Sequence, residues 1–338
     1  MGIVHNAVYC EGGRKLEPET LEVTYELLRE RHGMGWIGLY RPSRREIDSI
    51  AAEFALHPLA VEDTVSAHQR PKLERYGGVL FTVLRPASYV AAENRVELGE
   101  LHVFTGPDFV VTVRHAESPD IAAIRRRMEA DPALLALGPE AVLYAILDQV
   151  VDEYEPVVDG LEISIDEIES AVFAEDGGVS RRIYALSREL AGFQRATRPL
   201  LGMLEGLTEG FEKYHVDEEL QRSLRNVEDH AIRLIERVEG LRVLLQNILT
   251  VNATLVGQRQ NEEIQRLTES SLRQSEEVKR ISSWAAILFA PSLVPTVYGM
   301  NFRVMPELDW RLGYPFALLL MSAMCAVLYV VFRRRGWL

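Results

Sequence analysis

The sequence predicts an α+β membrane protein, in which an N-terminal α/β domain precedes a long helix and two C-terminal membrane spans. Three observations lead to this fold class. Residues 281–299 and 313–332 contain no charged side chain, and a helix of about 20 residues crosses the hydrocarbon core of a bilayer. No proline occurs between Pro199 and Pro291. Strand-like segments are confined to the first 115 residues.

The strand-like segments belong to a domain that we expect over residues 1–135. They are rich in β-branched and aromatic residues and lie at 36–40, 79–90, 99–106 and 109–115. The turn sequence TGPD joins the last two into a hairpin. Helical patterns at 43–56 and 119–130 intervene, so we expect a layered α/β domain in the cytosol.

Two helices are predicted within residues 136–215, at 139–171 and 180–208, and we expect them to form an antiparallel pair. The first carries a cluster of acidic residues, namely Asp159, Glu162, Asp166, Glu167 and Glu169. Such a cluster either attracts cations or forms a solvated helix face, which is the commoner case. Both interpretations stay open at this point.

Residues 216–280 are predicted to form a long stalk helix that continues into the first span. Its apolar residues recur every three or four positions, which is typical of a helix that packs along other helices. This seam comprises Leu220, Leu224, Val227, Ala231, Leu234, Val238, Leu241, Leu245, Ile248 and Leu255. After a phase change within 252–265, the pattern resumes at Ile264, Leu267, Ser271, Gln274, Val278 and Ile281. A helix from Asp217 to Tyr298 would be about 120 Å long, and a break near Gly257 is the alternative.

The two predicted spans differ in character. Residues 313–332 are strongly apolar, whereas three serines and two prolines dilute residues 281–299. Small and polar side chains suit a helix that lines an aqueous pore. They equally suit close packing between helices, so both interpretations stay open.

Basic residues beside both spans set the expected topology. Lys279 and Arg280 precede the first span, and the tail at 333–338 begins with three arginines. Because positive residues stay on the cytosolic side, we expect both termini inside the cell and the loop 300–312 outside. The N-terminus shows no basic region followed by an apolar core, so we expect no signal peptide.

Composition and motifs argue against several other classes of protein. The net charge of −13, from 50 acidic and 37 basic residues, disfavours a nucleic-acid binder, which needs clustered Lys and Arg. The two cysteines, Cys10 and Cys325, are too few for a disulfide framework and too far apart in sequence for a zinc-binding pair. The sequence has no catalytic histidine pair, nucleophile elbow, phosphate-binding loop or dinucleotide fingerprint. We therefore do not expect an enzyme.

One cytosolic segment is unusual, namely residues 57–76 with the sequence HPLAVEDTVSAHQRPKLERY. Its adjacent acids Glu62 and Asp63 lie near a predicted helix or strand end. Carboxylate oxygens in such a place can bind a hard cation. From these residues alone, a helix-terminal charge pair is the more common interpretation.

Specific motifs surround the two spans. They are YGMNF at 298–302, MPEL at 305–308, Trp310, GYP at 313–315 and the ending Trp337-Leu338. Together with the cytosolic HPLAVED and HQRPK sequences, they resemble the family of CorA-type magnesium channels over nearly the whole chain. The resemblance implies a funnel-shaped homopentamer in the plasma (inner) membrane, in which the first span lines the pore. It also implies passive, potential-driven uptake of Mg²⁺, with Co²⁺ and Ni²⁺ accepted as well.

The candidate selectivity site consists of Gly299, Met300 and Asn301. Mg²⁺ gives up its waters reluctantly, and a ring of uncharged Asn301 amides would hold the hydrated ion loosely enough to release it. The candidate pore-lining residues are Ser275, Ser282, Ala286, Ala290 and Leu293. Leu293 is the candidate hydrophobic constriction, and the two prolines of this span, at 291 and 295, leave the helix phase open. Glu307 and Asp309 are expected to concentrate cations at the outer mouth.

The resemblance further implies that cytosolic Mg²⁺ keeps the pore closed. Glu62 and Asp63 match the family's acids on one side of that regulatory site, whereas Asn226 stands where an acid is common. Glu228 and Asp229 are candidate substitutes. Two alternatives to a magnesium channel stay open, a zinc transporter of the related ZntB type and a non-conducting membrane-anchored coiled-coil scaffold or metal sensor. The intact MPEL sequence favours the magnesium branch, and a scaffold would not need Asn301.

Overall fold

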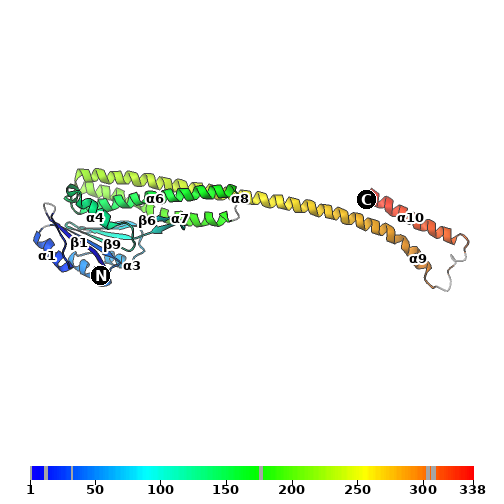
Figure 1. The fold of residues 1–338 in the computed structure, drawn as a ribbon, viewed down its shortest axis with the longest axis horizontal. Coiled ribbons are helices and arrows are strands. Elements are labelled where there is room, and N and C mark those ends of the chain that lie inside the picture. The colour runs from blue at the N-terminus through cyan, green and yellow to red at the C-terminus, as the bar shows by residue number, and fades with distance from the viewer. Residues whose placement is uncertain (1, 11–13, 32, 175–177, 302–304, 306–309) are drawn as a thin grey trace. The chain divides into compact units, whose positions relative to one another are not determined.

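The structure is a computed structural model that describes every residue except 1, 11–13, 32, 175–177, 302–304 and 306–309. The chain divides into two compact units, Met1–Asn252 and Ala253–Leu338. The first unit contains the strands and the paired helices, and the second contains the apolar C-terminal helices (Figure 1). The α/β domain, the long helix and the two apolar C-terminal helices of the predicted fold class are thus confirmed.

A seven-stranded mixed sheet forms the centre of the first unit, in the order β2-β1-β3-β9-β8-β5-β4. Among the described residues, β3 and β9 pair in parallel and the other neighbours in this sheet are antiparallel. The strands of this sheet are β1 (Ile3–Cys10), β2 (Arg14–Leu16), β3 (Met34–Tyr40), β4 (Lys72–Tyr76), β5 (Val79–Leu84), β8 (Leu101–Thr105) and β9 (Phe109–Arg114). The hairpin predicted from TGPD is the β8–β9 pair.

A separate two-stranded sheet pairs β6 (Ala87–Val90) with β7 (Arg95–Leu98). The strand predicted at 79–90 is therefore two strands, β5 and β6, which belong to different sheets. Pro86 lies between them. Because proline has no N–H to donate to a ladder, it marks the point at which the chain leaves the larger sheet.

Helices cover both faces of the seven-stranded sheet, as the predicted layers require (Figure 1). On one face, Ile37 and Val111 of the sheet share a core with three short helices. These are α1 (Leu21–Arg31), α2 (Arg44–Glu53) and α3 (Pro58–Ser66). On the other face, α6 (Pro139–Phe173) packs against β8 and β9. Two short helices, α4 (Ile121–Glu129) and α5 (Pro132–Leu135), lead into α6.

The predicted long helices of the first unit are confirmed. α7 (Val179–Lys213) packs beside α6, and α8 (Glu218–Phe289) follows. The nine seam residues of α8 from Leu220 to Ile248 are each at most 7% exposed, so the 3-4 pattern marks the buried face. α8 is helical through Gly257, and the alternative of a break there is wrong.

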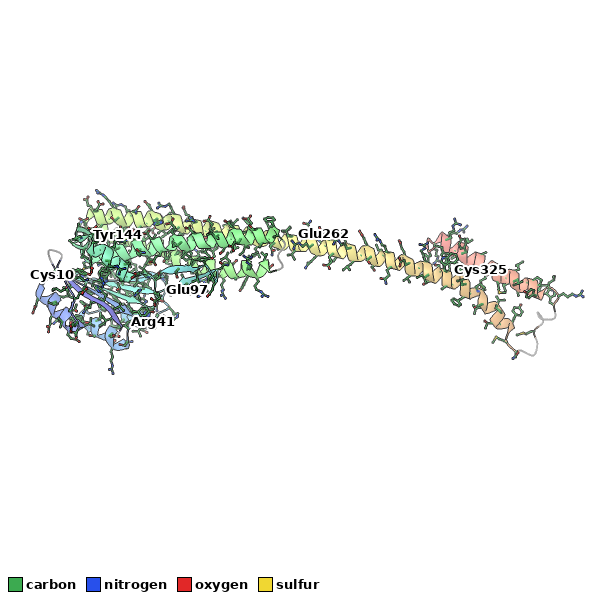
Figure 2. All side chains as sticks on the ribbon, viewed as in Figure 1. Cys10, Arg41, Glu97, Tyr144, Glu262 and Cys325 are labelled. Carbon is green, nitrogen blue, oxygen red and sulfur yellow. The ribbon has the colours of Figure 1, made fainter. Side chains whose placement is uncertain are left out.

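The second unit contains the rest of α8, the short α9 (Leu293–Tyr298) and α10 (Gly313–Arg334). Ala290–Ser292 form a 3₁₀ turn between α8 and α9. Pro291 causes this change because it lacks the N–H that would bond to the Ile287 carbonyl one turn earlier. That carbonyl instead accepts from the thiol of Cys325 on α10, with Sγ 3.5 Å from the oxygen (Figure 2). By length and composition, the helical run ending at Tyr298 and α10 are both candidate membrane spans.

Candidate functional site

The Gly299-Met300-Asn301 triplet directly follows the end of α9. The amide of Gly299 donates to the Pro295 carbonyl (2.9 Å) and that of Met300 to Val297 (3.2 Å), which completes the last turn. Asn301 is exposed. Gly299 has helical dihedral angles, φ −83° and ψ −2°, so the helix ends here without using the left-handed conformation open to glycine. Glu307 and Asp309 lie outside the described residues.

One side of this helical run is covered by α10. Ser283, Ile287 and Val294 are buried, at 1%, 7% and 9% exposure. Of the candidate pore residues, Ala286 and Ala290 are half-buried beside this covered side. Ser275, Ser282 and Leu293 are exposed. In the single chain, the candidate pore-lining residues therefore lie partly along the edge of the face that α10 covers and partly on the uncovered side.

Three hydroxyl groups in the first candidate span bond to their own helix. Ser283 Oγ donates to the Lys279 carbonyl (2.7 Å), Ser292 Oγ to that of Phe289 (2.6 Å), and Thr296 Oγ1 to that of Ser292 (2.8 Å). Such bonds satisfy a hydroxyl where no water is available. These serines and threonine are therefore compatible with an apolar environment and with a pore.

The candidate regulatory acids lie on α3 but face different surroundings. Glu62 is exposed, whereas the side chain of Asp63 is only 24% exposed. Asp63 Oδ2 is 2.6 Å from the ammonium of Lys72, which is also 2.6 Å from Glu74 Oε2. Burial alone would lower the pKa of Lys72, but the hydrogen bonds to Asp63 and Glu74 outweigh it and raise this pKa. Sequence reasoning missed Lys72, because the contact joins a helix to a strand.

A buried polar network anchors α3 to the sheet, and sequence reasoning missed it too. Glu100, 5% exposed, lies 2.6 Å from His102 Nε2 and 2.8 Å from the Arg85 guanidinium. His102 Nδ1 is 3.1 Å from the Thr64 hydroxyl, and His115 Nε2 is 3.1 Å from the Thr64 carbonyl oxygen. Burial is the main cause that lowers the pKa of His115, followed by the charge of His102.

The remaining candidate residues are spread over α6 and α8. Asn226 and Asp229 are exposed, and Glu228 accepts from the Thr208 hydroxyl at 3.3 Å. In the acidic cluster of α6, Asp159 and Glu162 both bind Arg237 of α8, at 2.7 and 2.8 Å. Across the part of the chain that the structure describes, no group of three or more His, Cys, Asp or Glu side chains is placed to hold a metal ion.

Comparison with known proteins identifies the family. The profile described as "CorA-like Mg2+ transporter protein" matches residues 31–334. The chain belongs to the CorA family. It is 33% identical over 306 residues to a putative metal ion transporter of Bacillus subtilis, YfjQ, covering 89% of both chains. It is 26% identical over 307 residues to the cobalt/magnesium transport protein CorA of Thermotoga maritima, covering 90% of this chain and 83% of that one.

Solved structures agree with this assignment at the level of the fold. The complete CorA magnesium transporter of Methanocaldococcus jannaschii superposes with a TM-score of 0.61 at 16% identity, covering 100% of both chains. The ZntB cytoplasmic domain of Vibrio parahaemolyticus gives a TM-score of 0.60 at 13% identity, covering 76% of this chain and 100% of that one. The chain therefore has the CorA-like fold and belongs to a family of divalent metal ion transporters, which is not a class of enzymes.

Proposed function

We propose that this CorA-family member is a Mg²⁺ channel that also admits Co²⁺ and Ni²⁺ and works by passive, potential-driven uptake. Asn301 is the residue that selects the hydrated ion. Gly299 and Met300 shape the outer mouth, with Glu307 and Asp309 attracting cations nearby. Glu62 and Asp63 take part in closing the pore when cytosolic Mg²⁺ is high. The protein spans the plasma (inner) membrane twice, with both termini and residues 1–280 in the cytosol.

One observation carries this proposal, namely the position of an uncharged, exposed amide directly after a helix that α10 covers on one side only. Apolar side chains on the open side, among them Leu288 (72% exposed) and Phe289 (73%), need a partner other than water. The exposed Asn301 amide then provides oxygen and N–H groups where the apolar helix ends. Uncharged oxygens suit an ion that keeps its water shell and must leave again.

The proposal includes a homopentamer, and the second apolar seam of α8 supports self-association. Ile264, Leu267, Val278 and Ile281 are between 55% and 69% exposed in the single chain. Their 3-4 spacing continues the pattern that is buried earlier in α8. Exposed apolar residues at that spacing pack against other helices. The same helix in neighbouring copies around a central axis would be such a partner. Native mass spectrometry of the detergent-solubilised protein tests the number of copies.

The test of function is ion flux into proteoliposomes that contain the purified protein. With a negative internal potential and low internal Mg²⁺, we expect Mg²⁺ entry, and competition by Co²⁺. Absence of Mg²⁺ entry under these conditions contradicts the proposal. A parallel Zn²⁺ arm decides between the magnesium channel and the zinc transporter, because the zinc alternative requires Zn²⁺ entry to exceed Mg²⁺ entry. A non-conducting scaffold predicts no flux of any ion.

A further inference from the structure

The helix that carries Glu62 and Asp63 is fixed in rotation about its own axis. Thr64 is fully buried and bonds to His102 through its hydroxyl and to His115 through its carbonyl oxygen. Successive residues of an α-helix are rotated by about 100°. With Thr64 turned into the domain, Asp63 points to one side, towards β4, and Glu62 points to solvent.

A turn after α3 brings β4 alongside Asp63. Ala67 and His68 have φ angles of 52° and 63°, in the left-handed region that residues other than glycine seldom occupy. The turn is held by two hydrogen bonds, because the amide of Gln69 donates to Glu100 Oε1 (3.2 Å) and its carbonyl oxygen accepts from Arg85 (3.4 Å). Lys72 therefore reaches Asp63 from a fixed position in the fold.

The Lys72 ammonium lies between two carboxylates, at 2.6 Å from Asp63 Oδ2 and 2.6 Å from Glu74 Oε2. The Lys72 side chain is 26% exposed. The Lys72 ammonium thus offsets part of the negative charge that Asp63 would offer to a cation. A divalent cation that binds Asp63 must displace the ammonium from that carboxylate, so that the half-buried ammonium keeps Glu74 but loses Asp63, which is unfavourable. Glu62 makes no ion pair with any residue that the structure describes.

We propose that Lys72 is a built-in competitor of divalent cations at Asp63, so that this chain senses cytosolic Mg²⁺ weakly and chiefly through Glu62. This inference rests on the proposed function, in which Glu62 and Asp63 close the pore. In this inference, Lys72 sets the Mg²⁺ concentration at which the pore closes. Without the ammonium, Asp63 and Glu74 face each other as like charges, and a divalent cation relieves their repulsion.

The test compares Lys72→Gln with Arg75→Gln in the full-length protein. Arg75 is on the same strand but on its opposite face, where its guanidinium lies over the Tyr214 ring at 4.4 Å. Its substitution removes the same charge without touching Asp63. Each purified variant is titrated with Mg²⁺ at constant ionic strength, and the thermal unfolding temperature is recorded. The Mg²⁺ concentration that gives half of the maximal rise in unfolding temperature measures Mg²⁺ binding, and it does so whether or not the protein conducts ions.

We expect Lys72→Gln to lower that Mg²⁺ concentration about tenfold, the scale on which charges about 4 Å apart act on each other in a well-hydrated, water-like environment. Arg75→Gln should change it less than twofold. The double variant Lys72→Gln/Asp63→Asn should return to the wild-type value, and Asp63→Asn alone should leave it nearly unchanged. Lys72→Met provides a second variant without charge or amide and should behave like Lys72→Gln.

Two results would overturn the inference. One is an identical Mg²⁺ titration for the wild type and both Lys72 variants, including the case in which none responds. The other is a tenfold weaker titration for Asp63→Asn alone, since that would mean Asp63 is already open to the cation. Flux assays on the same variants separate this inference from the proposed function. Tighter Mg²⁺ binding by Lys72→Gln in a protein that conducts no ion contradicts only the channel.

Discussion

Replacement of Glu100 by leucine tests the buried network that holds α3 on the sheet. Glu100→Leu removes the acceptor of three groups, His102 Nε2 at 2.6 Å, the Arg85 guanidinium at 2.8 Å and the Gln69 amide at 3.2 Å. Removing one partner of a buried ion pair costs about 3–5 kcal/mol. Arg85 is 22% exposed, so water can reach it and the lower end of that range applies. We expect about 3 kcal/mol.

In a unit of this size, 1 kcal/mol corresponds to a shift of about 2–4 °C in melting temperature, so the expected loss is about 6–12 °C. The assay is thermal unfolding of the detergent-solubilised full-length protein. The matched control is Glu97→Leu on β7 (Figure 2), whose carboxylate is 50% exposed and pairs with Arg95 at 2.6 Å. Such an exposed pair contributes at most about 1 kcal/mol. If Glu100→Leu melts within about 2 °C of the wild type, the network does not stabilise the domain as argued.

Three further predictions concern other parts of the chain. Burial, and then the charge of Arg125, lowers the pKa of His5 from 6.5 to about 4. As the pH falls from 6.5 to about 4, His5 therefore binds a proton in the unfolded chain but not in the folded protein. The free energy of unfolding should therefore fall by roughly 2–3 kcal/mol over this pH range. In the His5→Gln variant, the melting temperature should depend less on pH over the same range. Cys325→Ala should destabilise the protein by about 1–2 kcal/mol because the Ile287 carbonyl loses its donor, whereas Cys325→Ser, which keeps a donor, should melt close to the wild type. Asn301→Asp should bind Mg²⁺ more tightly and conduct it more slowly; equal or faster flux would refute the argument for an uncharged filter.

The sequence was most informative where a structural feature depends on local periodicity. The seam from Leu220 to Ile248 is buried as predicted, because apolar residues at 3-4 spacing form one face of a helix. Leu255 is only half-buried and Ile264 is exposed. The apolar pattern thus continues into a part of α8 where the single chain does not bury it. The hairpin at TGPD was equally readable, since the turn and both strands are adjacent in sequence.

Features that depend on distant contacts could not be read in this way. Glu62 and Asp63 look equivalent in sequence, yet the burial of Thr64 turns one to solvent and the other to Lys72. The turn that brings Lys72 there uses positive φ angles at Ala67 and His68, and alanine does not signal such a conformation. The pore-facing register cannot be read from the sequence, since Pro291 introduces a 3₁₀ turn that changes the phase of the helix at that point.

The central claim is that Asn301 selects the ion in a pore formed by several copies of this chain. Mg²⁺ flux of Asn301→Ala in proteoliposomes, with the number of copies determined on the same sample, tests it most directly. The account predicts that Asn301→Ala assembles like the wild type and no longer admits Mg²⁺. Wild-type Mg²⁺ flux through a correctly assembled Asn301→Ala protein would contradict it.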